Sequence, residues 1–177
     1  MKIIYLIFFI FLNILSCSLF AKSIAIVDIQ SLIDNNSEYQ NKLKEIEKIK
    51  KKYVKNLENE EKELTNISED IENSKLILSQ NEINIKIDEY NNKLTNYKIL
   101  IEEFNYHYQN EIINMREEVF NEIMKLLEKY ATENNIDLIL DSTSYLIASN
   151  SLDITKFINN KLQETNFKLE YNNFEKN

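Results

Sequence analysis

The chain has 177 residues, a formal net charge of −8 and no glycine, proline or tryptophan. This acidic balance argues against a dedicated nucleic-acid-binding protein, which would present a basic face. Because glycine and proline are the residues that most disrupt helix interiors, their absence favours long uninterrupted helices.

The first residues have the features of an export signal. Lys2 supplies a positive charge, residues 3–15 are almost entirely apolar, and small residues follow as far as Ala21. This is the order of regions found in secretory signal peptides. We therefore expect residues 1–21 to be a signal peptide, with Lys22 as the first mature residue.

Two other interpretations of this segment remain open. Residues 14–17 are a loose version of the lipid-attachment pattern, in which Cys17 would be lipidated and the chain anchored to a membrane. The apolar segment 3–21 is also barely long enough to span a bilayer as an uncleaved anchor. Association with a membrane is expected only if Cys17 carries a lipid.

The mature chain opens with a strand and then a helix. Residues 24–27 are a short apolar run rich in β-branched side chains, which predicts a buried strand. A short amphipathic turn is expected at 29–33, and the polar residues 34–37 mark a break. Ser37 and Gln40 have the spacing of a capping box, so a helix is predicted to begin at Ser37.

A coiled-coil seam dominates this predicted helix. Seam residues alternate three and four positions apart, which is the heptad pattern. They are Leu43, Ile46, Lys50, Tyr53, Leu57, Glu60, Leu64, Ile67, Ile71, Ser74 and Leu78. At 1.5 Å per residue this stretch would reach about 54 Å, with Lys50, Glu60 and Ser74 weakening the seam.

A turn at 79–82 is predicted to join this helix to a second one. The second seam contains Ile87, Tyr90, Leu94, Tyr97, Ile101, Phe104 and Tyr108. Beyond Tyr108 the apolar spacing changes to an eleven-residue rhythm, which straightens or reverses a supercoil. We expect an antiparallel helical hairpin whose second helix ends near 133–135, where asparagine can adopt the left-handed conformation.

Two more strands and a helix are predicted after the hairpin. Residues 136–140 and 145–148 are short apolar runs separated by a polar turn, which predicts a β-hairpin. Asp153 is expected to cap a last helix that ends at Leu162. The segment 163–177 is polar with scattered aromatic residues, and we expect it to be a loosely ordered, flexible tail.

Strands at both ends of a helical hairpin indicate an α+β protein that is mainly α. The strands must meet, so residues 22–36 and 134–162 would form a β-rich body, with 37–133 as the arm. Three short strands bury little surface alone, and their open edges favour association of several chains. The residues expected in this oligomer body are Ile24, Ile26, Val27, Leu138, Leu140, Tyr145 and Ile147.

Three segments give the chain a resemblance to the Skp/OmpH family of periplasmic outer-membrane-protein chaperones. Residues 24–30 are similar to the opening strand of the family, 136–141 to its second strand, and 152–162 to its closing capped helix. The resemblance covers 24–162 and implies a homotrimer with a β-rich body and three α-hairpin tentacles. It also implies ATP-independent binding of unfolded outer-membrane proteins in the cavity between the tentacles, in the periplasm.

Candidate client-binding residues lie outside the seams. Three interpretations are open for Leu76, Ile77, Ile83 and Ile85, which flank the predicted turn: an exposed apolar patch, packing across the turn, or a turn that lies elsewhere. Tyr106 also lies off the seam and is a further candidate for client contact.

Neither catalysis nor a cofactor is expected. The chain has one histidine, His107, and one cysteine, Cys17, so neither has a second such ligand for a metal. No glycine loop is present to hold a phosphate. The chain is therefore predicted to be a non-enzymatic holdase chaperone, or alternatively an envelope-anchored structural or adaptor lipoprotein.

Overall fold

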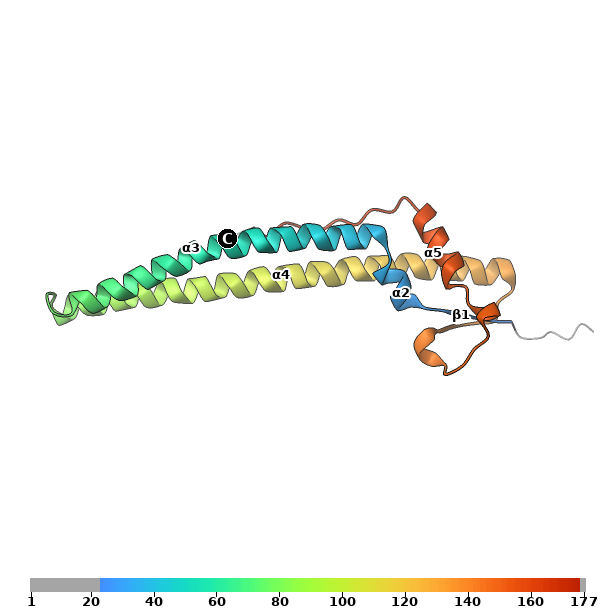
Figure 1. The fold of residues 1–177 in the computed structure, drawn as a ribbon, viewed down its shortest axis with the longest axis horizontal. Coiled ribbons are helices and arrows are strands. Elements are labelled where there is room, and N and C mark those ends of the chain that lie inside the picture. The colour runs from blue at the N-terminus through green and yellow to red at the C-terminus, as the bar shows by residue number, and fades with distance from the viewer. Residues whose placement is uncertain (1–22, 176–177) are drawn as a thin grey trace, which may run out of the picture.

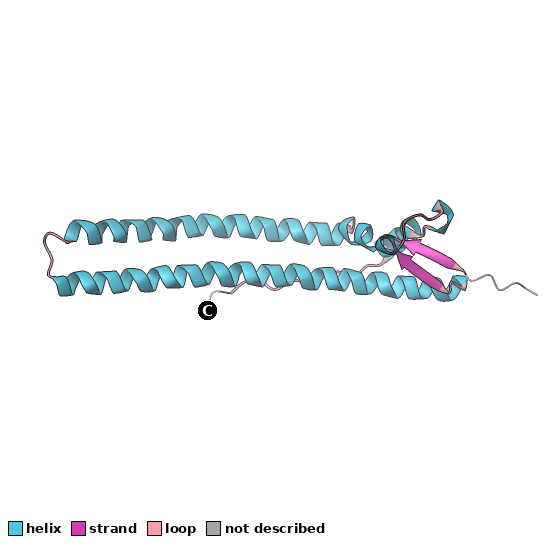
Figure 2. Cartoon of the chain, turned by 90° about the horizontal axis from the view of Figure 1, so that it is seen from below, coloured by secondary structure: helices cyan, strands magenta, loops and turns pink. Residues whose placement is uncertain are grey.

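The computed structural model describes residues 23–175. A long antiparallel hairpin of two helices projects from a small body that contains the strands (Figures 1 and 2). Helix α3, Ser37–Ser74, has 38 residues and helix α4, Gln80–Asn134, has 55 residues. Because α4 is the longer helix, its last turns extend past the start of α3 and support the body.

The body contains a two-stranded parallel sheet. Strand β1, Ile24–Val27, pairs with β2, Leu138–Asp141, with Ile24 opposite Leu138 and Val27 opposite Asp141. The prediction that strands from the two ends of the hairpin meet is therefore confirmed, although β2 begins two residues later than expected. Segments more than a hundred residues apart in the sequence are thus held together at the base of the arm (Figure 2).

The third strand predicted at 145–148 was wrong. The carboxylate of Asp141 accepts hydrogen bonds from the Thr143 hydroxyl at 2.6 Å and the Thr143 amide at 3.2 Å. This caps a 3₁₀ turn at Ser142–Ser144, and a second 3₁₀ turn follows at Asn150–Leu152. The turns carry residues 145–148, including Tyr145 and Ile147, into an irregular loop, so no β-hairpin forms.

The free edge of β1 is used by the start of the last helix instead. Ile26 forms a parallel bridge with Asp153, and the Ile154 amide donates to the Ile26 carbonyl at 2.9 Å. Helix α5, Thr155–Glu164, follows. The Asp153 carboxylate accepts from the Thr155 amide at 2.8 Å, while the Thr155 hydroxyl accepts from the Asp28 amide. These bonds fix the start of α5 against the end of β1.

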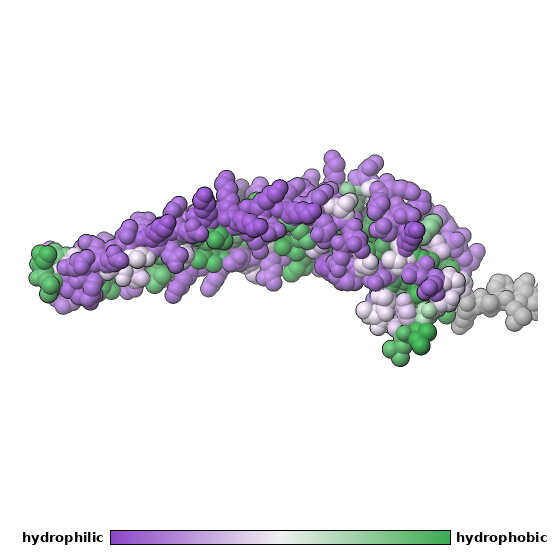
Figure 3. All heavy atoms as spheres, in the orientation of Figure 1, coloured by the Kyte–Doolittle hydropathy of each residue, from purple (hydrophilic) through white to green (hydrophobic). Residues whose placement is uncertain are grey.

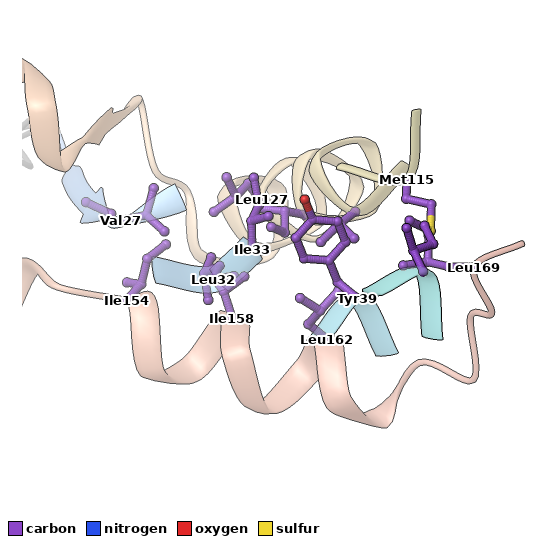
Figure 4. Packing of buried hydrophobic residues seen from close by; sticks show 14 of the residues in the cluster. Val27, Leu32, Ile33, Tyr39, Met115, Leu127, Ile154, Ile158, Leu162 and Leu169 are labelled. Atoms are coloured by element: carbon purple, nitrogen blue, oxygen red, sulfur yellow. The ribbon is translucent and has the colours of Figure 1, made fainter. Parts of the chain in front are cut away.

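The main core lies where α2, α4 and α5 converge. Helix α2, Ile29–Asp34, is capped by Asp28, whose carboxylate accepts from the Ser31 amide at 2.8 Å. Apolar side chains of α2, α4 and α5 point toward one another between the helices (Figure 4). In the chain from 23 to 175, the large side chains with no more than 1% of their surface exposed, which also come from β1, α3 and the tail, are Val27, Leu32, Ile46, Tyr108, Met115, Val119, Ile123, Ile158 and Leu169.

The arm follows the predicted seams. All eleven residues of the first predicted seam, from Leu43 in α3 to Leu78 in the turn that follows, are buried or half-buried. The seven of α4 from Ile87 to Tyr108 are also buried or half-buried. The distal seam has fewer fully buried residues than the base, since most of its members are only half covered by the facing helix. A heptad pattern with polar interruptions therefore does describe how the two helices pack.

The helix ends differ from the predictions by small amounts. Helix α3 is capped by Asn36 and not by Ser37, because the Asn36 side chain accepts from the Tyr39 amide at 2.8 Å. The turn of the hairpin lies at 75–79, since Ser79 already caps α4 through a capping box with Glu82. The predicted end of α4 is confirmed, with Asn135 in the left-handed conformation at φ 52°.

The segment after α5 differs from the flexible tail expected at 163–177. Residues 165–175 run back along the hairpin in an extended form (Figure 1). Leu169 is buried, and Phe167, Tyr171 and Phe174 pack against the core. The apolar residues of the tail are spaced singly along the sequence, and a polar segment of this kind was expected to be loosely ordered. No helix within 23–175 is long and apolar enough to cross a membrane.

Candidate functional site

The tip of the arm presents two bare aliphatic side chains. Leu76 and Ile77 are 95% and 84% exposed. The turn that carries them is ordered by backbone bonds, in which the amides of Ile77 and Leu78 donate to the Ser74 carbonyl at 3.0 and 2.9 Å. Apolar surface is correspondingly visible at the far end of the arm (Figure 3). The tip is therefore a small, positioned apolar contact point.

Not every predicted residue joins this tip. Ile83 is 6% exposed in the first turn of α4, so it does not contribute to an exposed patch. Ile85 is half exposed on the side of α4, and Tyr106 is 70% exposed much nearer the base. Leu76 and Ile77 thus form the tip pair, while Ile85 and Tyr106 lie separately along the arm.

A groove crosses the middle of the arm. It has a volume of about 520 Å³, and its apolar floor comprises Leu64, Tyr97 and Leu100. Glu63 lies on its rim and pairs with Lys93 across the hairpin at 2.6 Å. Burial raises the pKa of the Tyr97 hydroxyl, and nearby glutamates add to the effect. The groove offers apolar surface within a charged, solvated rim.

Near the base, an aromatic cluster covers the junction of α3 and α4. The rings of Tyr53 and Phe104 are stacked with centroids 3.7 Å apart and an interplanar angle of 5°. Phe174 from the tail meets both rings edge-on, with centroids 6.0 Å from Tyr53 and 5.4 Å from Phe104. Such edge-to-face contacts stabilise aromatic packing beyond the area that they bury.

Polar side chains of α4 hold the tail beside this cluster. His107 Nε2 lies 2.8 Å from the Asn172 carbonyl oxygen, and the Glu111 carboxylate accepts from the Asn172 amide at 3.0 Å. The Tyr108 hydroxyl accepts from the Phe174 amide at 3.4 Å. This arrangement was not predicted, and its signal in the sequence is the alternation of apolar and polar residues from Phe167 to Tyr171.

The body has its own exposed apolar surface. Leu146 and Ile147 are almost fully exposed in the loop after β2, and Ile24 and Leu138 are about half exposed on paired strands. The loop forms an apolar protrusion on the underside of the body (Figure 3). Of the other predicted body residues, Ile26 and Val27 are buried within the chain, while Leu140 and Tyr145 are half-buried.

The site chemistry is that of contact surfaces. Within residues 23–175 no group of three or more histidine, cysteine, aspartate or glutamate side chains is arranged to hold a metal ion. His107 is engaged by the tail and packs edge-on to Tyr108 with ring centroids 4.9 Å apart. Cys17, the predicted lipidation residue, lies outside the described residues.

A sequence profile described as "Outer membrane protein (OmpH-like)" matches residues 23–162. The chain belongs to the OmpH-like family. That match includes both strands, the hairpin and α5, and it ends just before the tail. A search of curated proteins found no match.

A solved structure has the same fold as this OmpH-like chain. It is that of a candidate outer membrane chaperone (OmpH-like) from Caulobacter crescentus CB15. The two chains superpose with a TM-score of 0.62 at 13% identity, over 84% of this chain and 90% of that chain. At this identity the similarity establishes the shared architecture of the OmpH-like fold.

Proposed function

We propose that this OmpH-like protein is an ATP-independent periplasmic holdase that binds unfolded outer-membrane proteins between its coiled-coil arms. The observation that carries the proposal is the exposed aliphatic pair Leu76 and Ile77, held at the end of a long arm that is anchored in a sheet-containing body. Exposed apolar surface on a stable scaffold can shield the apolar segments of an unfolded chain from aggregation. Membership of the OmpH-like family and the described role of its structural relative support the same function.

Several arms acting together would explain how such small contacts hold a client. Each tip offers only two side chains, and burial of an aliphatic side chain contributes about 1.5–3 kcal/mol. Binding at linked sites raises the overall affinity without any new type of contact. A homotrimer would supply three tips around one space, and rapid exchange at each tip would leave the client free to be released.

The body offers a surface through which a trimer could assemble. Ile147 is 93% exposed, and Leu138 is half exposed on β2, for which the structure gives no strand partner on the side away from β1 among residues 23–175. Such edges invite pairing with another chain. We expect light scattering to give three times the mass of the monomer, and Ile147→Lys to reduce that mass. A monomer at micromolar concentration would contradict this part of the proposal.

The chaperone function is tested by the aggregation of an unfolded outer-membrane β-barrel on dilution from denaturant. A several-fold excess of the chain from Lys22 should suppress light scattering without ATP. The double variant Leu76→Ser with Ile77→Ser should need about tenfold more protein for the same suppression, because each arm loses two apolar contacts. No suppression by the unaltered chain would overturn the proposal.

A matched control tests whether the tip residues contribute more to the suppression of aggregation than exposed apolar residues elsewhere on the arm. Val54 and Ile113 are exposed aliphatic residues on the shafts of α3 and α4, away from the groove. The double variant Val54→Ser with Ile113→Ser also removes two exposed aliphatic side chains, and we expect it to suppress aggregation as well as the unaltered chain. Equal losses in both double variants would show that the tip has no special role.

The place of action depends on residues outside the described part of the chain. We infer export with cleavage after Ala21, which leaves a soluble chain that starts at Lys22. Mass spectrometry of the native N-terminus checks this inference. A lipid on Cys17 would instead indicate a membrane-tethered protein, which fits an adaptor role as well as a tethered holdase.

A further inference from the structure

Side chains of α4 contact the main chain of the tail. Glu111 and Tyr108 accept hydrogen bonds from the main-chain amides of Asn172 and Phe174, and His107 contacts the Asn172 carbonyl. Glu111 lies about one helical turn after His107 and Tyr108 and also accepts from the Asn172 side chain at 3.3 Å. Three of these contacts are made to main-chain groups, which any extended peptide possesses.

Apolar contacts occupy the rest of this surface. Leu169 is only 1% exposed and lies beside Met115 of α4 (Figure 4). Phe174 lies edge-on against the stacked rings of Tyr53 and Phe104. We call the area made by Tyr53, Phe104, Tyr108 and Met115, together with His107 and Glu111, the tail-binding surface. It accepts apolar side chains and main-chain polar groups at the same time.

Residues 167–171 of the tail alternate apolar and polar side chains, as a transmembrane β-strand does. Phe167, Leu169 and Tyr171 are packed against the core, and they alternate with the exposed residues Lys168 and Glu170. Strands of outer-membrane barrels alternate apolar and polar residues in the same way. The tail thus resembles, in chemistry, a short segment of an unfolded barrel protein.

The bonds that hold the tail are also easy to exchange. Among residues 23–175, the hydrogen bonds of the segment 166–175 are made to side chains of the hairpin and not to its main chain. Peeling away the tail would break no sheet or helix. The family match, over residues 23–162, ends before this segment.

We propose that the tail-binding surface is a second peptide-binding site, which takes extended segments with alternating apolar residues and which the chain's own tail occupies in their absence. This rests on the proposed function for the identity of the ligands as unfolded barrel segments. A tethered competitor acts at a high effective concentration, so only segments that bind well, or that are also held at the arm tips, displace it. Occupancy by the tail keeps the aromatic cluster covered while no client is present.

A labelled synthetic peptide with the sequence of residues 165–177 tests the site directly by fluorescence anisotropy. The unaltered chain from Lys22 should bind it weakly, because its own tail competes. The double variant Leu169→Ser with Phe174→Ser weakens the tail and should bind the peptide about tenfold more tightly or better, since apparent affinity scales with the fraction of open sites. Glu170→Ser changes an exposed residue next to Leu169 and should bind like the unaltered chain.

A variant of the surface itself provides the complementary test. Adding Glu111→Lys to the double variant removes the acceptor of the Asn172 amide and should abolish the gain in affinity. The tip variant Leu76→Ser with Ile77→Ser should leave peptide binding unchanged. Equal peptide affinity in the double variant and the unaltered chain, with circular dichroism unaltered, would overturn the proposal.

Hydrogen exchange of the unaltered chain decides the matter if the tail variants do not fold. Saturating peptide should raise the exchange rate of the tail amides of Asn172 and Phe174 at least severalfold, since their acceptors are then used by the peptide. Unchanged exchange in the tail would count against the second site even if aggregation is suppressed. Conversely, peptide binding without any suppression of aggregation would refute only the holdase function.

Discussion

The base of the arm and its distal half are built from the same two helices but packed in different ways. At the base, α2, α5 and the tail add further layers around α4, so that Met115, Val119 and Ile123 are fully buried. In the distal half each helix has only the other as a partner. There Leu64 and Ile71 each retain 8% exposure.

This difference places the stability of the fold at the base and the contact with clients in the distal half. The base can hold the strands together because its core is closed on all sides, and closed cores supply most of the free energy of folding. The distal half stabilises little beyond its own seam, so it can open locally without unfolding the body. A client can therefore bend or load the arms while the body remains assembled.

Truncating one isoleucine in each region should give the largest effect. Ile123→Ala removes a fully buried side chain at the base, and we expect the free energy of unfolding to fall by about 3 kcal/mol. Ile71→Ala makes the same change in the distal seam and should cost about 1 kcal/mol, because a two-helix interface collapses more readily around the gap. Urea denaturation followed by circular dichroism measures both values.

The two variants should also differ in where they loosen the protein. Hydrogen exchange should rise throughout the body for Ile123→Ala but only between the tip and the middle of the arm for Ile71→Ala. Equal global losses in the two variants would show that arm and body unfold as one cooperative unit. The comparison between the regions would then describe packing alone.

The features that sequence reasoning captured depend on local or periodic patterns. The heptads fixed the seams because a helix returns the same face to its partner every seven residues. The pairing of β1 with β2 could be expected, since strands at both ends of a hairpin have no other partner nearby. These patterns survive in a single sequence without knowledge of distant contacts.

What the sequence could not show depends on particular tertiary contacts. The loop at 145–148 is apolar enough for a strand, but the Asp141 side chain caps a 3₁₀ turn that carries the chain away from the free edge of β2. The tail is held by His107, Tyr108 and Glu111, which lie more than sixty residues earlier. Likewise, Ser79 fits a turn as well as a helix cap, and only the start of α4 distinguishes them.

Removal of the Ser79 cap at the start of α4 should have an effect of intermediate size in the distal half. The Ser79 hydroxyl accepts from the Glu82 amide at 3.5 Å, and the Glu82 carboxylate accepts from the Ser79 amide at 2.9 Å and from its hydroxyl. Ser79→Ala should destabilise the first turn of α4 by about 1 kcal/mol. Hydrogen exchange should show faster opening at the tip, with the urea midpoint of the body unchanged.

The pH dependence of this effect follows from Glu82. The hydrogen bonds from Ser79 hold the pKa of the Glu82 carboxyl below its ordinary value of 4.5. Because the pKa is lowered in the fold, the contribution of this pair is present above pH 4.5 and is lost as the pH falls below it. Ser74→Ala deletes a hydroxyl on the other side of the same turn, and it should leave tip exchange unchanged at any pH.

The smallest effect is expected at the boundary between the two regions, where Tyr53 stacks on Phe104. The Tyr53 hydroxyl is buried without a hydrogen-bond partner among residues 23–175. Tyr53→Phe keeps the stacked ring and removes the unsatisfied group, so it should raise the free energy of unfolding by up to about 1 kcal/mol at neutral pH. Tyr106→Phe, at an exposed hydroxyl of the same arm, should change it by much less.

Alkaline pH should enlarge the difference in the free energy of unfolding between Tyr53→Phe and Tyr106→Phe. Burial raises the pKa of the Tyr53 hydroxyl above 10.0, with a further contribution from Glu60 and Glu103. As the pH rises, the Tyr53 hydroxyl loses its proton in the unfolded chain before it does so in the folded chain. The free energy of unfolding of the unaltered protein therefore falls as the pH rises above 10. Tyr53→Phe should lose less stability over that range. A parallel decline in Tyr53→Phe and in the unaltered protein would show that the Tyr53 hydroxyl is solvated. The closed packing of the base would then end nearer the body than Tyr53.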